Sequence, residues 1–327
     1  MQLSILTSVH DVPDADLRLN LTSSLAQDAD LEVIVIADAA TESNLNTLRE
    51  FASEDKRLKV FGVEDGKNVG PGAALNRALM YASGEYIGVV DGDDWADTNF
   101  FGTLLKTAEA TRAPVAKGNV IMHRNGVPVR VLNICDDMRT NHYKFSWQHW
   151  SAIYNRKFLL ENGILWFPET SKNAETLFLA KVCAFTDSIG LCPDVFYNYN
   201  RRPNSVDADL LGEQKFIDSS HVRYKAAEFL LMVFNHLVPG HLAWYVGEEC
   251  LSRLIIESAR ADSNKAYEAA ARGFVNIVTL VDGSSSVVPF ERYVRERFPK
   301  FTGELSDYGA ILSYMKSQPY KTAVECS

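Results

Sequence analysis

The first 90 residues alternate apolar runs with amphipathic segments, and this alternation limits the choice of fold more than any other feature. The run LEVIVIA at 31–37 is almost entirely apolar, as a parallel strand buried on both faces must be. Similar strands are expected at 3–9, 58–63 and 86–90, with helices between them at 17–27, 43–54 and 73–82. Ser43 is expected to cap the second helix, and Gly84 to end the third. The series predicts an α/β fold with a doubly wound, mostly parallel sheet.

Three polar residues fall where the predicted strands end. They are His10, Asp38 and Asp91, and each directly follows an apolar run. Ligands of doubly wound sheets bind beyond the carboxyl ends of the strands. The sequence therefore places a ligand site at this edge of the sheet.

The signals change along the rest of the chain. Residues 114–200 mix short strands with one clear helix near 175–185, and the pattern is helical from 212 onward, at 216–237, 242–261 and 264–281. We therefore expect a ligand-binding domain over 1–206 and a helical C-terminal region over 207–327. The apolar faces of these helices must be buried. A homodimer is favoured over peripheral membrane contact, because no strongly basic amphipathic helix is present.

Composition excludes several classes of protein. The net charge of -9 argues against a non-specific nucleic-acid binder, which is usually basic. The five cysteines form no CxxC pair, so a disulfide framework or zinc site is not expected and a cytoplasmic location is favoured. No apolar run approaches the roughly 18 residues of a spanning helix.

The most specific motif is Asp91-Gly92-Asp93-Asp94, which we call the acidic turn. Three carboxylates this close repel one another unless a cation lies among them, and a hard divalent ion such as Mg²⁺ or Mn²⁺ prefers oxygen ligands. Such an ion could also offset the charge of a diphosphate. On spacing alone, a cap for a helix over 98–110 is equally plausible. An EF-hand is disfavoured because its twelfth position would be Gly102.

The order of segments resembles that of the family 2 glycosyltransferases, which build bacterial surface glycans on a GT-A-type fold. The resemblance runs from residue 3 to about 206. Its parts are the opening strand ending at His10-Asp11, the strand ending at Asp38, the pairs Asn68-x-Gly70 and Leu75-Asn76, Gly84-Glu85-Tyr86-Ile87 before the acidic turn, Asn173-Ala174-Glu175, and Tyr197-Asn198-Tyr199 with Arg201.

The resemblance implies roles for individual residues. It implies that Asp38 binds the nucleotide base, usually uracil, and that Asp91 lies near the donor ribose and the metal. It also implies that Asp93 is the direct metal ligand and that Glu175 is the catalytic base. The remaining donor-binding candidates are Ser8, His10, Asn68, Gly92, Arg201 and Arg202. Trp95, Trp147, His149 and Trp150 are candidates for the acceptor pocket.

Four departures from the family pattern affect the prediction. His10 stands where the family usually has tyrosine, and Ser8 where it usually has proline. Leu75 stands where arginine is common, and Ala174-Glu175 replaces the usual Glu-Asp pair, so the proposed base carries one extra methylene. The expected function is that of an inverting, metal-dependent transferase, which moves a sugar from a UDP-linked donor to a glycan or lipid-linked acceptor. Such a protein would work in the cytoplasm or at the inner face of the membrane. The alternatives are a sugar nucleotidyltransferase and a donor-binding module with little transfer activity. The nucleotidyltransferase is disfavoured because residues 8–17 contain no glycine, lysine or arginine.

Overall fold

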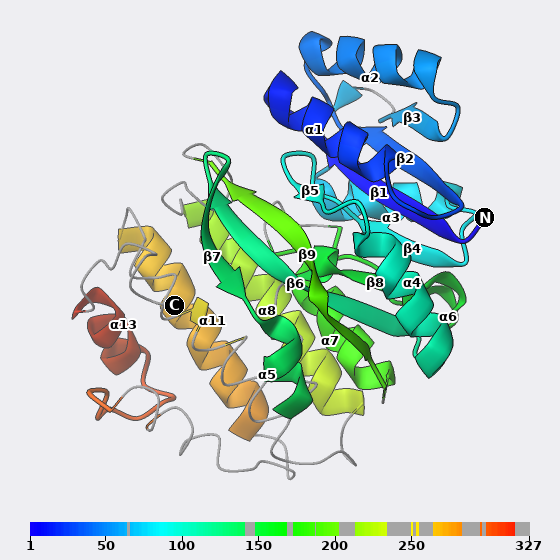
Figure 1. The fold of residues 1–327 in the computed structure, drawn as a ribbon. Coiled ribbons are helices and arrows are strands. Elements are labelled where there is room, and N and C mark those ends of the chain that lie inside the picture. The colour runs from blue at the N-terminus through cyan, green and yellow to red at the C-terminus, as the bar shows by residue number, and fades with distance from the viewer. Residues whose placement is uncertain are drawn as a thin grey trace. The chain divides into compact units, whose positions relative to one another are not determined.

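The computed structural model describes residues 1–63, 66–140, 148–168, 173–186, 188–202, 213–233, 250, 253–254, 264–282, 295 and 299–317 (Figure 1). The chain forms two compact units. Unit 1 comprises Met1–Glu169 and Phe185–Ala208, and unit 2 comprises Thr170–Ala184 and Asp209–Ser327. The segment that contains the predicted base therefore groups with the C-terminal residues.

Unit 1 is built on one sheet with the strand order β3-β2-β1-β4-β8-β6-β9-β5. Its first part is parallel and consists of β3 (Leu58–Gly62), β2 (Leu31–Ala37), β1 (Leu3–Val9) and β4 (Tyr86–Val89). The connections are α1 (Asp14–Leu25), α2 (Glu42–Glu54) and α3 (Pro71–Tyr81). The predicted α/β fold with a mostly parallel sheet is confirmed.

The second part of the sheet mixes strand directions. β8 (Ala152–Asn155) is antiparallel to β4 and β6 (Val115–Arg124), whereas β9 (Gly190–Arg201) is parallel to β6. The short β5 (Trp95–Ala96) pairs with β9, and β7 (Val127–Leu132) pairs with β6. The helical segments here are α4 (Phe100–Thr111), α5 (Ile134–Thr140), η3 (His149–Ser151) and α6 (Arg156–Glu161). Because β5 comes soon after β4 in the chain, its pairing with β9 brings β9 next to the segment that follows β4.

Side chains at the helix ends correct two predictions. The second helix is capped by Thr41, whose hydroxyl accepts the Asn44 N–H, and not by Ser43. The third helix ends at Tyr81 with Ala82 as its C-cap, so Gly84 does not end it. Gly84 is required for another reason: a Cβ there would lie 2.5 Å from the backbone nitrogen of Ser4 on β1.

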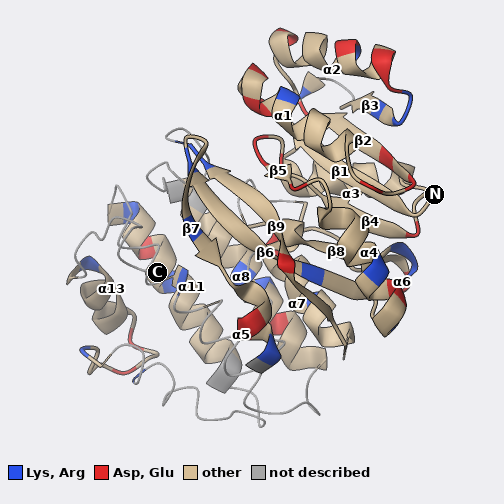
Figure 2. Ribbon diagram, viewed as in Figure 1, with Lys and Arg blue, Asp and Glu red and all other residues tan. Residues whose placement is uncertain are grey.

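The outer helices of unit 1 carry charges of both signs. Figure 2 shows acidic and basic residues side by side on α1 and α2. Arg18 joins the two helices by binding Asp14 on α1 and Glu50 on α2. These ion pairs are exposed to solvent, so they contribute little to stability.

The described part of unit 2 is helical apart from short connecting segments. It contains α7 (Glu175–Phe185, of which Phe185 belongs to unit 1), α8 (Glu213–Val233), α11 (Asn264–Asp282) and α13 (Tyr308–Ser317). α11 packs against α8 and α13. The predicted helical C-terminal region is confirmed, although most of the helix expected at 242–261 lies outside the described residues. Within the described residues, no helix is long and apolar enough to cross a membrane.

Candidate functional site

The carboxyl ends of β1, β2 and β4 lie side by side because β1 pairs in parallel with both neighbours. The acidic turn begins two residues after the end of β4, and a Cβ on Gly92 would lie only 3.1 Å from the Ser8 carbonyl oxygen on β1. His10 reaches toward the end of β2, with Nδ1 2.8 Å from the Asp38 carbonyl oxygen. The structure thus brings four of the predicted donor-binding residues to one edge of the sheet.

Asp38 is 1% exposed and holds the loop before α3. Its carboxylate accepts the N–H groups of Val69 at 2.7 Å and Gly70 at 3.0 Å. The side-chain oxygen of Asn68 accepts the same Gly70 N–H at 2.8 Å. Gly70 has a φ of 84°, a conformation that glycine adopts without strain. The Asn68–Gly70 segment is therefore fixed against Asp38, while contact of either residue with a nucleotide stays a prediction.

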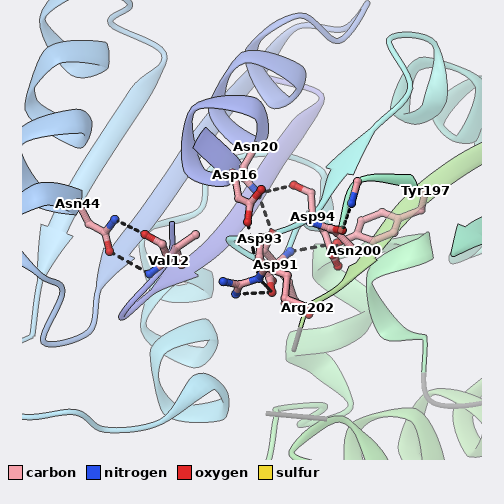
Figure 3. A network of polar contacts seen from close by, with 11 residues as sticks. Val12, Asp16, Asn20, Asn44, Asp91, Asp93, Asp94, Tyr197, Asn200 and Arg202 are labelled. Carbon is pink, nitrogen blue, oxygen red and sulfur yellow. Dashed lines mark hydrogen bonds and ion pairs between the residues drawn. The ribbon is translucent and has the colours of Figure 1, made fainter. Parts of the chain in front are cut away.

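Within the acidic turn, Asp94 is the member that the protein itself uses. Its buried carboxylate accepts the Tyr197 hydroxyl at 2.9 Å and the Asn200 N–H at 2.7 Å (Figure 3). Burial raises the pKa of Asp94, and the charges of Asp93 and Asp91 raise it further. Asp94 therefore attaches β9 to the acidic turn. Neither it nor Asp93 caps the next helix, which begins only at Phe100.

Tyr197 is completely buried and bridges two residues of the turn. Its hydroxyl donates to Asp94 and accepts the Asp91 N–H at 3.1 Å. Its ring stacks on Trp150 with the centroids 4.3 Å apart. Burial raises the pKa of Tyr197 well above its ordinary value, followed in effect by the charges of Asp94 and Asp91. The hydroxyl consequently stays protonated and available as a donor.

Asn20 on α1 also holds the acidic turn in place. This buried amide donates to the carbonyl oxygens of Asp91 at 2.8 Å and Asp94 at 3.1 Å. One residue thus holds both ends of the turn. The loop between β1 and α1 is held in a similar way, because Asn44 on α2 exchanges two hydrogen bonds with the backbone of Val12 (Figure 3).

Asp93 differs from Asp94 because a cation already lies against it. Arg202, which follows β9, binds Asp93 Oδ2 through Nη2 at 2.7 Å and Nε at 3.1 Å (Figure 3). The Asp93 side chain is 23% exposed. Arg202 Nε also lies 3.6 Å from Asp16 Oδ2 in the first turn of α1. Burial raises the pKa of Asp16; the charge of Arg202 opposes this shift, and that of Asp93 adds to it.

The residues at this edge fit a divalent cation that is bound together with a diphosphate. No group of three or more His, Cys, Asp or Glu side chains gathers into a metal site among the residues that the structure describes. Mg²⁺ and similar ions usually take one or two carboxylates and complete their shell with phosphate and water oxygens. Asp93 is partly exposed and already attracts the positive charge of Arg202. It therefore suits the predicted role as a ligand, with Asp91 beside it.

Comparison with known proteins decides the family. The model of glycosyl transferase family 2 matches residues 4–169, half of the chain. The chain belongs to this family. Over 249 residues it is 25% identical to the putative glycosyltransferase EpsH of Bacillus subtilis, covering 72% of this chain and 70% of EpsH. It is 27% identical to the uncharacterized glycosyltransferase EpsJ of the same organism over 192 residues, covering 54% of this chain and only 55% of EpsJ.

Solved structures share the fold across nearly the whole chain. Residues 1–349 of TarS from S. aureus, in complex with UDP-GlcNAc, match with a TM-score of 0.75 and 18% identity, covering 97% of this chain and 91% of that one. The mannosyltransferase PcManGT from Pyrobaculum calidifontis, in complex with GDP-Man and Mn²⁺, matches with a TM-score of 0.51 and 14% identity, covering 96% and 85%. The GT-A-type fold predicted from the sequence is thereby confirmed.

The positions of the remaining predicted residues do not test the roles predicted for them. Glu175 is the first residue of α7 in unit 2, and Asn173, two residues earlier, has a φ of 58°. Arg201 is the last residue of β9. Trp95 lies in β5 with its ring 4.6 Å from that of His123.

The other acceptor candidates do not form one surface in the described structure. Trp150 is 3% exposed and stacks between Tyr197 and Tyr199. His149 is 7% exposed, with its ring 6.1 Å from that of Trp166. Packing within unit 1 accounts for both residues. Trp147 lies outside the described residues. Contact of these side chains with an acceptor stays a prediction.

Proposed function

We propose that this protein is an inverting, cation-dependent glycosyltransferase that moves a sugar from a UDP-linked donor to a hydroxyl of a glycan or lipid-linked acceptor during surface polysaccharide synthesis. Membership of glycosyl transferase family 2 supports the reaction class. The UDP-GlcNAc bound to TarS, which shares the fold, supports the donor. Similarity to ExoO, a succinoglycan biosynthesis protein of Rhizobium meliloti that is 26% identical over 237 residues, supports the pathway.

The observation that carries the proposal is that Asp94 and Asp93 in the acidic turn lie in different surroundings. Asp94 is buried and bound by two donors from β9, whereas Asp93 stays partly exposed opposite a guanidinium. A partly exposed carboxylate that is held beside an arginine suits a ligand carrying both a positive ion and negative phosphates.

At the donor end, the proposed roles follow the positions of the side chains. Asp38 and His10 would contact the nucleoside, with the backbone beside Ser8 and Asn68 lining the same edge. Arg201 and Arg202 would bind the diphosphate, since guanidinium groups form paired hydrogen bonds with phosphate oxygens. A bound Mn²⁺ or Mg²⁺ would offset the negative charge that develops on the leaving group.

At the acceptor end, Glu175 is proposed as the general base. It begins α7, where the helix dipole favours the ionised carboxylate. Glu175 would take the proton from an acceptor hydroxyl, whose oxygen then attacks the anomeric carbon from the face opposite the diphosphate. The new glycosidic bond forms as the bond to the diphosphate breaks, and the anomeric configuration inverts.

Replacing the proposed base tests this assignment. We expect Glu175→Gln to lower turnover by at least about 10²-fold, the usual contribution of a general base, and to leave UDP affinity nearly unchanged. Glu42→Gln is a matched control, because Glu42 is also the first residue of a helix but is exposed and paired with Arg49. Normal turnover in Glu175→Gln would exclude Glu175 as the base.

A screen of nucleotide sugars with Mn²⁺, with and without glycan acceptors, tests the reaction itself. The proposal requires transfer with inversion, established by linkage analysis of the product. Binding without hydrolysis or transfer would instead indicate a donor-binding module. Formation of pyrophosphate from a nucleoside triphosphate and a sugar phosphate would indicate a nucleotidyltransferase.

The proposal also includes a cytoplasmic location and a homodimer. Contact with the inner face of the membrane is a separate part of the proposal, for the case of a lipid-linked acceptor. Light scattering after size exclusion tests the dimer. Sedimentation with vesicles containing anionic lipids tests membrane contact. A monomer that stays in the supernatant would remove both parts without affecting the reaction.

A further inference from the structure

Arg202 lies between two carboxylates from distant parts of unit 1. Asp93 comes from the acidic turn and Asp16 from the first turn of α1, and both face the same guanidinium, at 2.7 Å and 3.6 Å (Figure 3). All three side chains are mostly buried, with exposed fractions of 19% for Arg202, 23% for Asp93 and 24% for Asp16. Charges removed from solvent to this degree interact more strongly than exposed pairs.

The shorter contact occupies the carboxylate that fits a metal. Both guanidinium contacts are to Asp93 Oδ2, so a divalent cation bound by either oxygen of this carboxylate comes close to the guanidinium and repels it. A cation that binds Asp93 therefore favours movement of Arg202 away from it, and a displaced arginine that stays mostly buried needs another anion. Asp16 is such an anion, since its Oδ2 already lies 3.6 Å from Arg202 Nε. The donor diphosphate would be the second anion within its reach.

We propose that Arg202 passes from Asp93 to Asp16 when the cation and diphosphate bind, which makes Asp16 a positioning residue for donor binding. This inference rests on the cation-dependent donor binding of the proposed function. In the donor-free protein, Arg202 acts as an internal cation that neutralises Asp93. Once exchanged, Arg202 is held by Asp16 on the diphosphate side of the site.

The exchange has two consequences for binding of the cation alone. Arg202 competes with the ion for Asp93, so removing the guanidinium should strengthen binding of the bare ion. Asp16 lowers the cost of displacing Arg202, so removing the Asp16 charge should weaken binding of the ion. The second effect depends on Arg202 and should largely disappear when Arg202 is absent. A purely structural role for Asp16 would show no such dependence.

The experiment is a double-mutant cycle read out by Mn²⁺ binding, measured as the loss of the free-ion signal in electron paramagnetic resonance. The proteins are the wild type, Asp16→Asn, Arg202→Gln and the double variant, each with and without UDP. Arg49→Gln is the control, since it removes the same charge from an exposed residue of α2 that binds Glu42. Arg202→Lys and Asp16→Glu keep the charges and serve as second variants if the neutral ones fold poorly.

Without UDP, we expect Arg202→Gln to bind Mn²⁺ about fivefold more tightly, the factor that corresponds to an ion pair of about 1 kcal/mol. We expect Asp16→Asn to bind it about fivefold more weakly in the wild-type background and to change affinity by less than about twofold in the Arg202→Gln background. Arg202→Lys should fall between the wild type and Arg202→Gln, because lysine lacks the fork.

Two results would overturn the exchange while leaving the proposed function intact, provided that the wild type binds Mn²⁺ in the presence of UDP. One is equal Mn²⁺ affinity of the wild type and Arg202→Gln without UDP. The other is an equal effect of Asp16→Asn in both backgrounds. If none of the proteins binds Mn²⁺ even with UDP, the proposed function itself is wrong and the exchange falls with it.

Discussion

The amino end of the parallel strands contains a buried carboxylate whose effect on stability can be worked out in detail. Glu32 on β2 has a fully buried side chain that accepts four hydrogen bonds. Ser4 and Ser83 donate three of them to Oε1, and Lys59 donates the fourth to Oε2 at 2.6 Å. Ser4 also accepts the Gly84 N–H. The network thus connects the ends of β1, β2 and β3 with the start of β4.

Burial raises the pKa of Glu32, but the hydrogen bonds from Lys59, Ser4 and Ser83 together outweigh burial and lower the pKa from 4.5 to about 2. Each pKa unit corresponds to about 1.4 kcal/mol, so the shift contributes about 3 kcal/mol. Because Lys59 is 45% exposed, solvent screens part of this, and about 2 kcal/mol is a reasonable lower value. The folded-state pKa is depressed, so the stabilisation is complete above pH 4.5 and is lost as the pH falls toward 2.

We expect Glu32→Gln to lower the free energy of unfolding by about 2–3 kcal/mol at pH 7, measured by urea denaturation. The difference between variant and wild type should shrink steadily between pH 4.5 and pH 2, because the wild-type carboxyl becomes neutral there. Glu50→Gln is the control, since Glu50 pairs with Arg18 on the surface and should change stability little. A deficit of Glu32→Gln that stays the same at pH 2 and pH 7 would refute the reasoning.

Three further substitutions test individual contacts. Tyr197→Phe removes the hydroxyl that bridges the acidic turn and should lower the free energy of unfolding by about 2–4 kcal/mol. The control Tyr154→Phe removes a hydrogen bond to a backbone carbonyl and should cost less. Equal losses of stability in thermal denaturation would contradict the bridge. Ala39→Gly should stabilise the fold by about 1 kcal/mol, because Ala39 has a φ of 51°; a lower melting temperature would argue against strain there. Gly84→Ala places a Cβ 2.5 Å from the Ser4 backbone nitrogen, so the variant should unfold at a markedly lower urea concentration than the wild type. An unchanged unfolding midpoint would show that β1 can shift to accept the Cβ at little cost.

The parallel half of the sheet could be predicted from sequence because long apolar runs leave few alternatives. The strand at 31–37 was predicted with its observed bounds. In the mixed half, β5 and β8 could not be predicted, since they are too short to show a period and are defined by partners far along the chain. The start of α4 was placed too early, because Thr98 and Asn99 resemble caps as much as helix residues.

Within the site, the sequence predicted which motif matters but not how its carboxylates divide their roles. Spacing alone could not show that Asp94 is bound by Tyr197 and Asn200, since both lie more than 100 positions away. Asn20 did leave a signal: it lies three residues after Leu17 and one before Leu21 on the buried side of α1. A polar residue among buried ones indicates a buried partner. Asp16 left no comparable signal.

We propose above that the acidic turn holds a divalent cation against a diphosphate. Calorimetric titration of UDP into the wild type and Asp93→Asn, with Mn²⁺ and with EDTA, tests this directly. We predict that Mn²⁺ strengthens binding to the wild type by at least about tenfold, which is 1.4 kcal/mol, and that this gain is absent in Asp93→Asn. The same UDP affinity with Mn²⁺ and with EDTA in a well-folded wild-type sample would contradict the account.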